Sequence, residues 1–79
     1  MIDRTTGLPL RVEEGTVGPY VRLPFDQLAE IKRVLESHRL HYTVREDIIS
    51  LSGGPFIAVV DLGRGTDAEA VQTILDGVV

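Results

Sequence analysis

The apolar residues between Phe25 and His38 recur at steps of three and four, the period of an amphipathic helix. They are Leu28, Ile31, Val34 and Leu35. Pro24 precedes them, and proline fits the first position of a helix because an amide there has no partner within the helix. The pattern predicts a helix with one core-facing stripe. It ends without the usual glycine, since Ser37-His38-Arg39 stands at that place.

A second helical period follows Gly65 and runs to about Asp76. Its inward-facing residues are Ala68, Val71, Ile74 and Leu75. Gly77 supplies the stop signal that is typical of a helix C-terminus. The chain is therefore expected to contain two helices.

Three segments have the pattern of β-strands. Tyr20–Leu23 and Leu40–Arg45 alternate polar and apolar residues, as strands with one buried face do. Phe56–Val60 is apolar on both faces, which is typical of a central strand that is covered on both sides.

Two weaker strands complete the prediction. Ile48–Leu51 lies between expected turns at Glu46-Asp47 and Ser52–Pro55. Leu8–Val12 could form an edge strand or an arm, because Pro9 lacks the backbone donor that a central strand requires.

This order of elements predicts an α+β fold. We expect a small antiparallel or mixed sheet of three to four strands with two helices packed on one face, joined by a right-handed crossover. Residues 1–15 would be an N-terminal arm with a possible edge strand, and residues 16–79 a single α+β domain. From Tyr20 to Leu75 the layout resembles the ferredoxin-like architecture and small bacterial domains assigned to signal transduction, with the arm as a candidate for the missing last strand. The resemblance implies a regulatory or binding role.

Composition narrows the class of partner. The 79 residues carry a net charge of −4, which disfavours nucleic acid because such binding depends on neutralising phosphates. The chain has no cysteine, and no apolar run approaches the ~18–20 residues of a membrane span. The N-terminus lacks the pattern of a secretory signal. We expect a cytoplasmic protein with neither nucleic acid nor membrane as a partner.

The stretch Gly63–Ala68 fits Gly-x-Gly-x-x-Ala, a form of the nucleotide-binding fingerprint. That motif also needs a strand after its helix and an acidic residue about 20 positions further on, and too few residues follow. We therefore interpret Thr66 as the N-cap of the last helix and Glu69 as its capping-box partner. Arg64 is the one residue of this turn that could meet an anionic ligand.

The sequence offers little for catalysis or cofactor binding. His38 and His41 are the only histidines, and the predicted helix ends between them, so their side chains need not converge on a metal. No nucleophile and base are placed together by their spacing. We therefore expect no catalytic residues, no metal, no cofactor and no enzymatic activity.

The remaining candidate is a surface. If both helices cover one face of the sheet, alternation places these residues on the other: Tyr20, Arg22, His41, Thr43 and Arg45. The central strand would add either Phe56, Ala58 and Val60 or Ile57 and Val59. An apolar centre rimmed by arginine and aromatic residues is typical of a protein interface. The competing interpretation is that the N-terminal arm folds over this face.

Three functional hypotheses follow. The first is a non-enzymatic interaction or regulatory module whose partner is another protein or a second copy, most simply a homodimer formed through the open face or through strand edges. The second is a sensor of a small anionic ligand, recognised by Arg64 or Arg22. The third is an acidic inhibitor or antitoxin-like protein that masks a basic partner.

Overall fold

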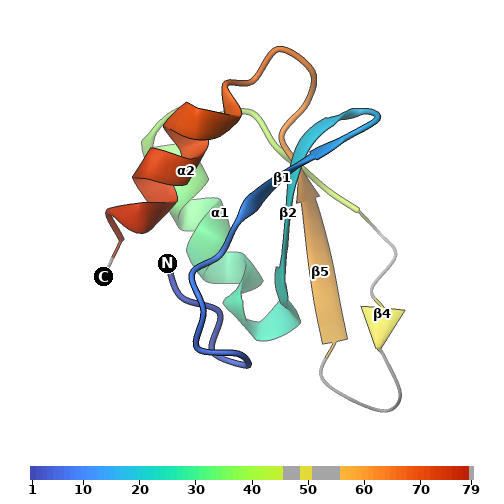
Figure 1. The fold of residues 1–79 in the computed structure, drawn as a ribbon, viewed down its shortest axis with the longest axis vertical. Coiled ribbons are helices and arrows are strands. Elements are labelled where there is room, and N and C mark those ends of the chain that lie inside the picture. Colours follow the sequence, from blue (N-terminus) through green and yellow to red (C-terminus); the bar gives the residue numbers. More distant parts are fainter. Residues whose placement is uncertain (46–48, 51–55, 79) are drawn as a thin grey trace.

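Two helices cover one face of an antiparallel sheet in the computed structural model, which describes residues 1–45, 49–50 and 56–78 (Figure 1). The strands are β1 (Val12–Gly15), β2 (Gly18–Pro24), β3 (Thr43–Val44), β4 (Ile49–Ser50) and β5 (Phe56–Asp61). A 3-10 turn, η1 (Phe25–Gln27), leads into α1 (Leu28–Ser37), and α2 (Ala68–Asp76) follows β5. The predicted α+β class is confirmed.

The strand order is β1-β2-β5-β3, with β4 also paired to β5, and every pairing is antiparallel. β5 is central, as its apolar sequence predicts. β2 pairs with one of its edges, while β3 pairs with the end and β4 with the start of its other edge. Its residues Ala58, Val59 and Val60 are buried. β1 forms the outer edge beside β2.

The core lies between the helices and one face of β2 and β5. Val21 pairs with Val60 and Leu23 with Ala58, and all four side chains are buried. The helices contribute buried residues from their predicted stripes: Ile31, Leu35, Val71 and Leu75. Within the described residues, neither helix has the length and hydrophobicity needed to cross a membrane.

The N-terminal segment belongs to this core. Met1 and Leu10 are buried, and the chain start lies beside α2 (Figure 1). The α-amino group of Met1 donates to the carbonyl oxygens of Leu75 and Val78. A positive charge is favourable there, because the C-terminal end of a helix carries partial negative charge.

Two strand predictions require correction. The first strand is Val12–Gly15 rather than Leu8–Val12. Before Val12 the chain leaves the sheet edge: Leu10 enters the core, and Pro9 forms only an isolated bridge. The turns predicted at Glu46-Asp47 and Ser52–Pro55 lie outside the described residues.

β3 is also shorter than predicted, with Thr43–Val44 in place of Leu40–Arg45. The cause is the end of α1. Arg39 adopts a φ of 56°, its amide bonds the Glu36 carbonyl, and the Leu40 amide bonds the Leu35 carbonyl. These two bonds form a Schellman motif, which holds the chain at the helix terminus and delays the strand.

The start of α2 differs from the predicted capping box. The N-cap is Asp67, whose carboxylate accepts from the amides of Glu69 and Ala70 at 3.0 and 3.2 Å. Thr66 lies one residue earlier, and its hydroxyl donates to the Leu62 carbonyl at 2.6 Å. Thr66 is therefore committed to the turn, and the prediction that Thr66 and Glu69 cap the helix is wrong.

Candidate interaction surface on the open sheet face

Charged and polar side chains form two adjacent rows on the sheet face that points away from the helices. The pairing register places Glu13 beside Tyr20, Tyr20 beside Asp61, and Asp61 beside Thr43. Because successive side chains of a strand alternate between faces, all four point away from the buried residues Val21 and Val60. We call this set the acidic row: Glu13, Tyr20, Asp61 and Thr43.

The next row along the strands is basic. Arg22 pairs with Val59, whose carbonyl oxygen accepts from the Arg45 amide at 2.9 Å. Arg11 directly precedes β1, outside its paired residues, and lines the same groove as Arg22. We call this set the basic row: Arg11, Arg22, Val59 and Arg45.

Arg22 links the two rows on the β1 side. Its guanidinium donates through Nε and Nη2 to the two carboxylate oxygens of Glu13, at 2.9 and 3.2 Å. The hydrogen bond to Glu13 and the charge of that carboxylate raise the pKa of Arg22. Because the side chains of Arg22 and Glu13 are 60% and 37% exposed, this surface pair contributes little to stability.

Arg45 makes the equivalent link on the β3 side. It donates through Nε and Nη2 to the Asp61 carboxylate at 2.7 and 2.8 Å. Its guanidinium carbon lies 5.5 Å from the centre of the Tyr20 ring, within the range of a cation–π contact. Asp61 is only 19% exposed, so this pair is more sheltered than the pair of Arg22 and Glu13.

An apolar groove of about 560 Å³ continues the open face towards the N-terminal segment. Leu8 and Pro9 form the wall on the side of the segment, and Ile57 and Val59 form the wall on the side of β5. Residues of both rows, Arg11, Arg22 and Glu13, also line it. The segment therefore borders the open face rather than covering all of it: Val59 is buried, whereas Arg22, Thr43 and Arg45 remain exposed.

The structure brings together four of the five predicted interface residues: Tyr20, Arg22, Thr43 and Arg45. His41 is exposed and precedes β3, outside the paired strands. Of the two alternatives for β5, Ile57 and Val59 face the open side. Glu13, Asp61 and Arg11 were not predicted. Alternation within β1 could have placed Glu13 on this face, had the strand been located.

Arg64, the predicted ligand contact, supports the backbone of the turn. Its Nη2 atom donates to the Thr16 carbonyl oxygen at 3.2 Å, which ties the turn before α2 to the β1–β2 hairpin. Gly18 is the point of closest approach between the two turns, since a Cβ atom there would lie 2.7 Å from the carbonyl carbon of Gly63.

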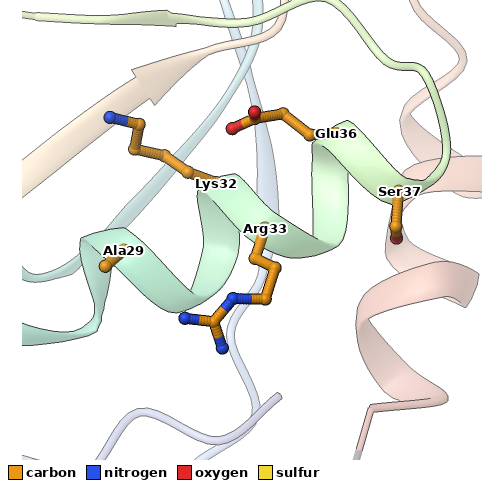
Figure 2. A pocket seen from close by; sticks show the side chains of 5 residues that line it. All are labelled: Ala29, Lys32, Arg33, Glu36 and Ser37. Atoms are coloured by element: carbon orange, nitrogen blue, oxygen red, sulfur yellow. The ribbon is translucent and has the colours of Figure 1, made fainter.

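A second hollow lies on the outer surface of α1 (Figure 2). Among the described residues, its lining comes from this helix alone: Ala29, Lys32, Arg33, Glu36 and Ser37. Figure 2 shows Lys32 and Glu36 extending from one flank of the helix and Arg33 from the other. The part of the chain that the structure describes adds no residue of a second element to this lining. Across residues 1–45, 49–50 and 56–78, no cluster of three histidine, aspartate or glutamate side chains could hold a metal ion.

Comparison of the chain with protein-family models, with curated proteins and with solved structures finds no match. The resemblance to ferredoxin-like bacterial signalling domains therefore stays a prediction.

Proposed function

We propose that the protein is a non-enzymatic interaction module that associates with a second copy of itself through the open face of the sheet. The observation that carries this proposal is the apolar groove that joins the two charged rows. Leu8 in its wall is 64% exposed, and it stands beside exposed arginines. Exposed apolar surface rimmed by arginine and tyrosine is the composition of protein interfaces. We expect the association to occur in the cytoplasm.

The edge of β1 is a less suitable route to self-association. The Val12 amide points away from β2 and donates to the Gln72 side chain at 2.8 Å, and the Leu10 carbonyl accepts from the same side chain at 3.0 Å. A strand added at this edge would have to displace both bonds. This supports the face over the edge.

The anionic-ligand sensor ranks second. Arg22 and Arg45 already hold carboxylates through two hydrogen bonds each, and Arg64 holds the Thr16 carbonyl. A ligand would have to compete with these acceptors. The acidic-inhibitor hypothesis is supported by the net charge of −4 alone.

Sedimentation equilibrium tests the proposal. The apparent mass should rise above 8.7 kDa as the concentration increases from micromolar to millimolar. Leu8→Asp should weaken the association, because it places a charge in the groove. Ala29→Asp on the outer surface of α1 is the control and should have no effect (Figure 2). A mass that stays at 8.7 kDa at every concentration contradicts self-association.

A further inference from the structure

The open face is electrically asymmetric along its strands. The acidic row contains Glu13 and Asp61 and no basic residue, whereas the basic row contains three arginines and no acidic residue. β2 and β5 cross both rows, so a negative band and a positive band lie side by side across the sheet. This pattern restricts how two such faces can meet.

Two copies that pack face to face by two-fold symmetry are related by an axis lying in the interface. An axis parallel to the strands would place each row over the same row of the other copy and would oppose like charges. An axis across the strands, between the two rows, places acid over base. Since opposed like charges are strongly unfavourable at an interface, only the second arrangement is self-complementary.

We infer that two copies stack their open faces about an axis that runs across the strands, so that the acidic row of each lies over the basic row of the other. This arrangement rests on the self-association proposed above and specifies its geometry. It places Arg11 near Glu13 of the second copy, and Tyr20 near Arg22 of the second copy.

Both contacts are compatible with the ion pairs already present. A carboxylate has about four lone-pair sites, so Glu13 can accept from Arg11 of the second copy while it retains Arg22. The Arg45 guanidinium of the same chain lies over the Tyr20 ring, and Arg22 of the second copy would be a further guanidinium near this half-buried ring. The intramolecular pairs hold the acceptors in place, which reduces the entropy lost on association.

The same axis supplies an apolar contact. It carries the β1–β2 hairpin turn of one copy over the groove of the other. The turn precedes the start of β2, whereas the groove residues Leu23 and Ile57 lie near the end of β2 and the start of β5. Val17 at the turn is 51% exposed and is the apolar residue that would reach the groove at Leu8 and Ile57. Each copy contributes one turn and one groove, so the contact closes as a dimer.

A charge-reversal cycle tests the arrangement. Arg11→Glu opposes Glu13 of the second copy, and Glu13→Arg opposes Arg11 of the second copy. Each single variant should therefore dimerise roughly tenfold more weakly or worse. A mixture of the two variants should regain affinity, because the glutamate introduced in one chain then faces the arginine introduced in the other. The double variant in one chain should recover in the same way.

Matched controls separate this effect from general charge and folding. Arg33→Glu on α1 makes the same charge change as Arg11→Glu (Figure 2). Glu14→Arg makes the same charge change as Glu13→Arg, at the neighbouring position of β1 that faces the other side of the sheet. Neither should alter the dimerisation constant. Thermal denaturation of each variant checks that the fold is intact, and recovery in the mixture requires folded chains in any case.

The outcomes distinguish the two claims. Loss in both single variants with recovery in the mixture supports the crossed arrangement. Loss without recovery, or no loss in either variant, overturns it, while the proposed module stands if Leu8→Asp still weakens the dimer. Absence of any concentration-dependent mass in the unmodified protein overturns the proposed self-association and this arrangement with it.

Discussion

Gln27 and Gln72 hold the N-terminal segment in the same manner, although one precedes α1 and the other lies within α2. The side-chain oxygen of Gln27 accepts from the Arg4 amide at 2.9 Å, and its Nε2 atom donates to the Ile2 carbonyl at 2.8 Å. Gln72 makes the same two bonds to residues 10 and 12, which are likewise two positions apart. Each side-chain amide therefore bonds one backbone amide and one backbone carbonyl, as a neighbouring β-strand would.

Loss of the Gln27 amide should be the more costly of the two changes, because Gln27 is only 2% exposed and Gln72 is half-buried. We expect Gln27→Met to lower the free energy of unfolding by about 2–3 kcal/mol, since two backbone groups lose their partners while the side-chain volume is kept. Gln72→Met should cost about 1 kcal/mol, because its backbone partners stay closer to water. Urea denaturation measures both. Equal losses would contradict the role of burial.

Gly18 lies where the β1–β2 hairpin meets the turn before α2, and we expect this position to tolerate no side chain. Its φ of 111° disfavours other residues, and the backbone of Gly63 and Arg64 occupies the space that a Cβ atom would need. We expect Gly18→Ala to destabilise the protein by at least ~2 kcal/mol. Gly63→Ala is the control, because its φ is also positive but the space is open. It should cost about 1 kcal/mol.

The N-cap of α2 provides a third prediction. Asp67→Ala should cost about 1 kcal/mol, because the Glu69 and Ala70 amides lose their acceptor. Asp67→Asn should retain most of this stability. Glu69→Ala should cost less than Asp67→Ala, since its side chain does not return to the cap. If Glu69→Ala and Thr66→Ala prove the two costly changes instead, the capping box is restored.

Arg39 stands where a helix terminus favours glycine. Its φ of 56° is left-handed, a region that L-residues other than asparagine and aspartate seldom adopt. Arg39→Gly should therefore raise the free energy of unfolding by roughly 0.5–1 kcal/mol. His38→Gly is the comparison, because His38 has a φ of −99° and should gain nothing. A stability gain at both positions would argue against relief of backbone strain.

The sequence predicts those features that depend on local periodicity. Ile31 and Leu35 are buried because the three-and-four spacing fixes one face of a helix, whatever the helix packs against. Phe56–Val60 becomes the central strand, as its continuous apolar run predicts, but the expected cover on both faces is incomplete, because Phe56 is 58% exposed and Ile57 is half-buried. Neither inference depends on distant residues.

Features that depend on one particular hydrogen bond or on the register of a strand pair are not predictable in this way. Thr66 and Asp67 are both good N-caps, and the choice between them depends on the Thr66 hydroxyl reaching the Leu62 carbonyl. The two charged rows depend on the hairpin register that sets Glu13 beside Tyr20. A shift of that register by one residue would turn Glu13 to the other face.

Tyr42 gives a prediction for pH. Its hydroxyl donates to the Glu36 carboxylate at 2.8 Å. This hydrogen bond, followed by burial and the charge of Glu36, raises the pKa of Tyr42 above 10.0. Because the folded protein holds the phenolic proton more tightly, the contribution to stability is present below pH ~10 and is lost as the pH rises through the raised value. The free energy of unfolding should therefore fall as the pH rises above 10, and Tyr42→Phe should remove this fall.

A spectroscopic titration of the tyrosine hydroxyl separates the ionisation of Tyr42 from other changes of the protein at alkaline pH. The chain has two tyrosines and no tryptophan, so in a Tyr20→Phe variant the tyrosinate absorbance reports Tyr42 alone. Adding Glu36→Gln should lower its pKa, because the carboxylate acceptor and its charge are removed together. Adding Glu30→Gln removes a carboxylate of α1 that pairs with Arg4 and should leave the titration unchanged. A pKa that does not fall with Glu36→Gln would show that the hydrogen bond is not its cause.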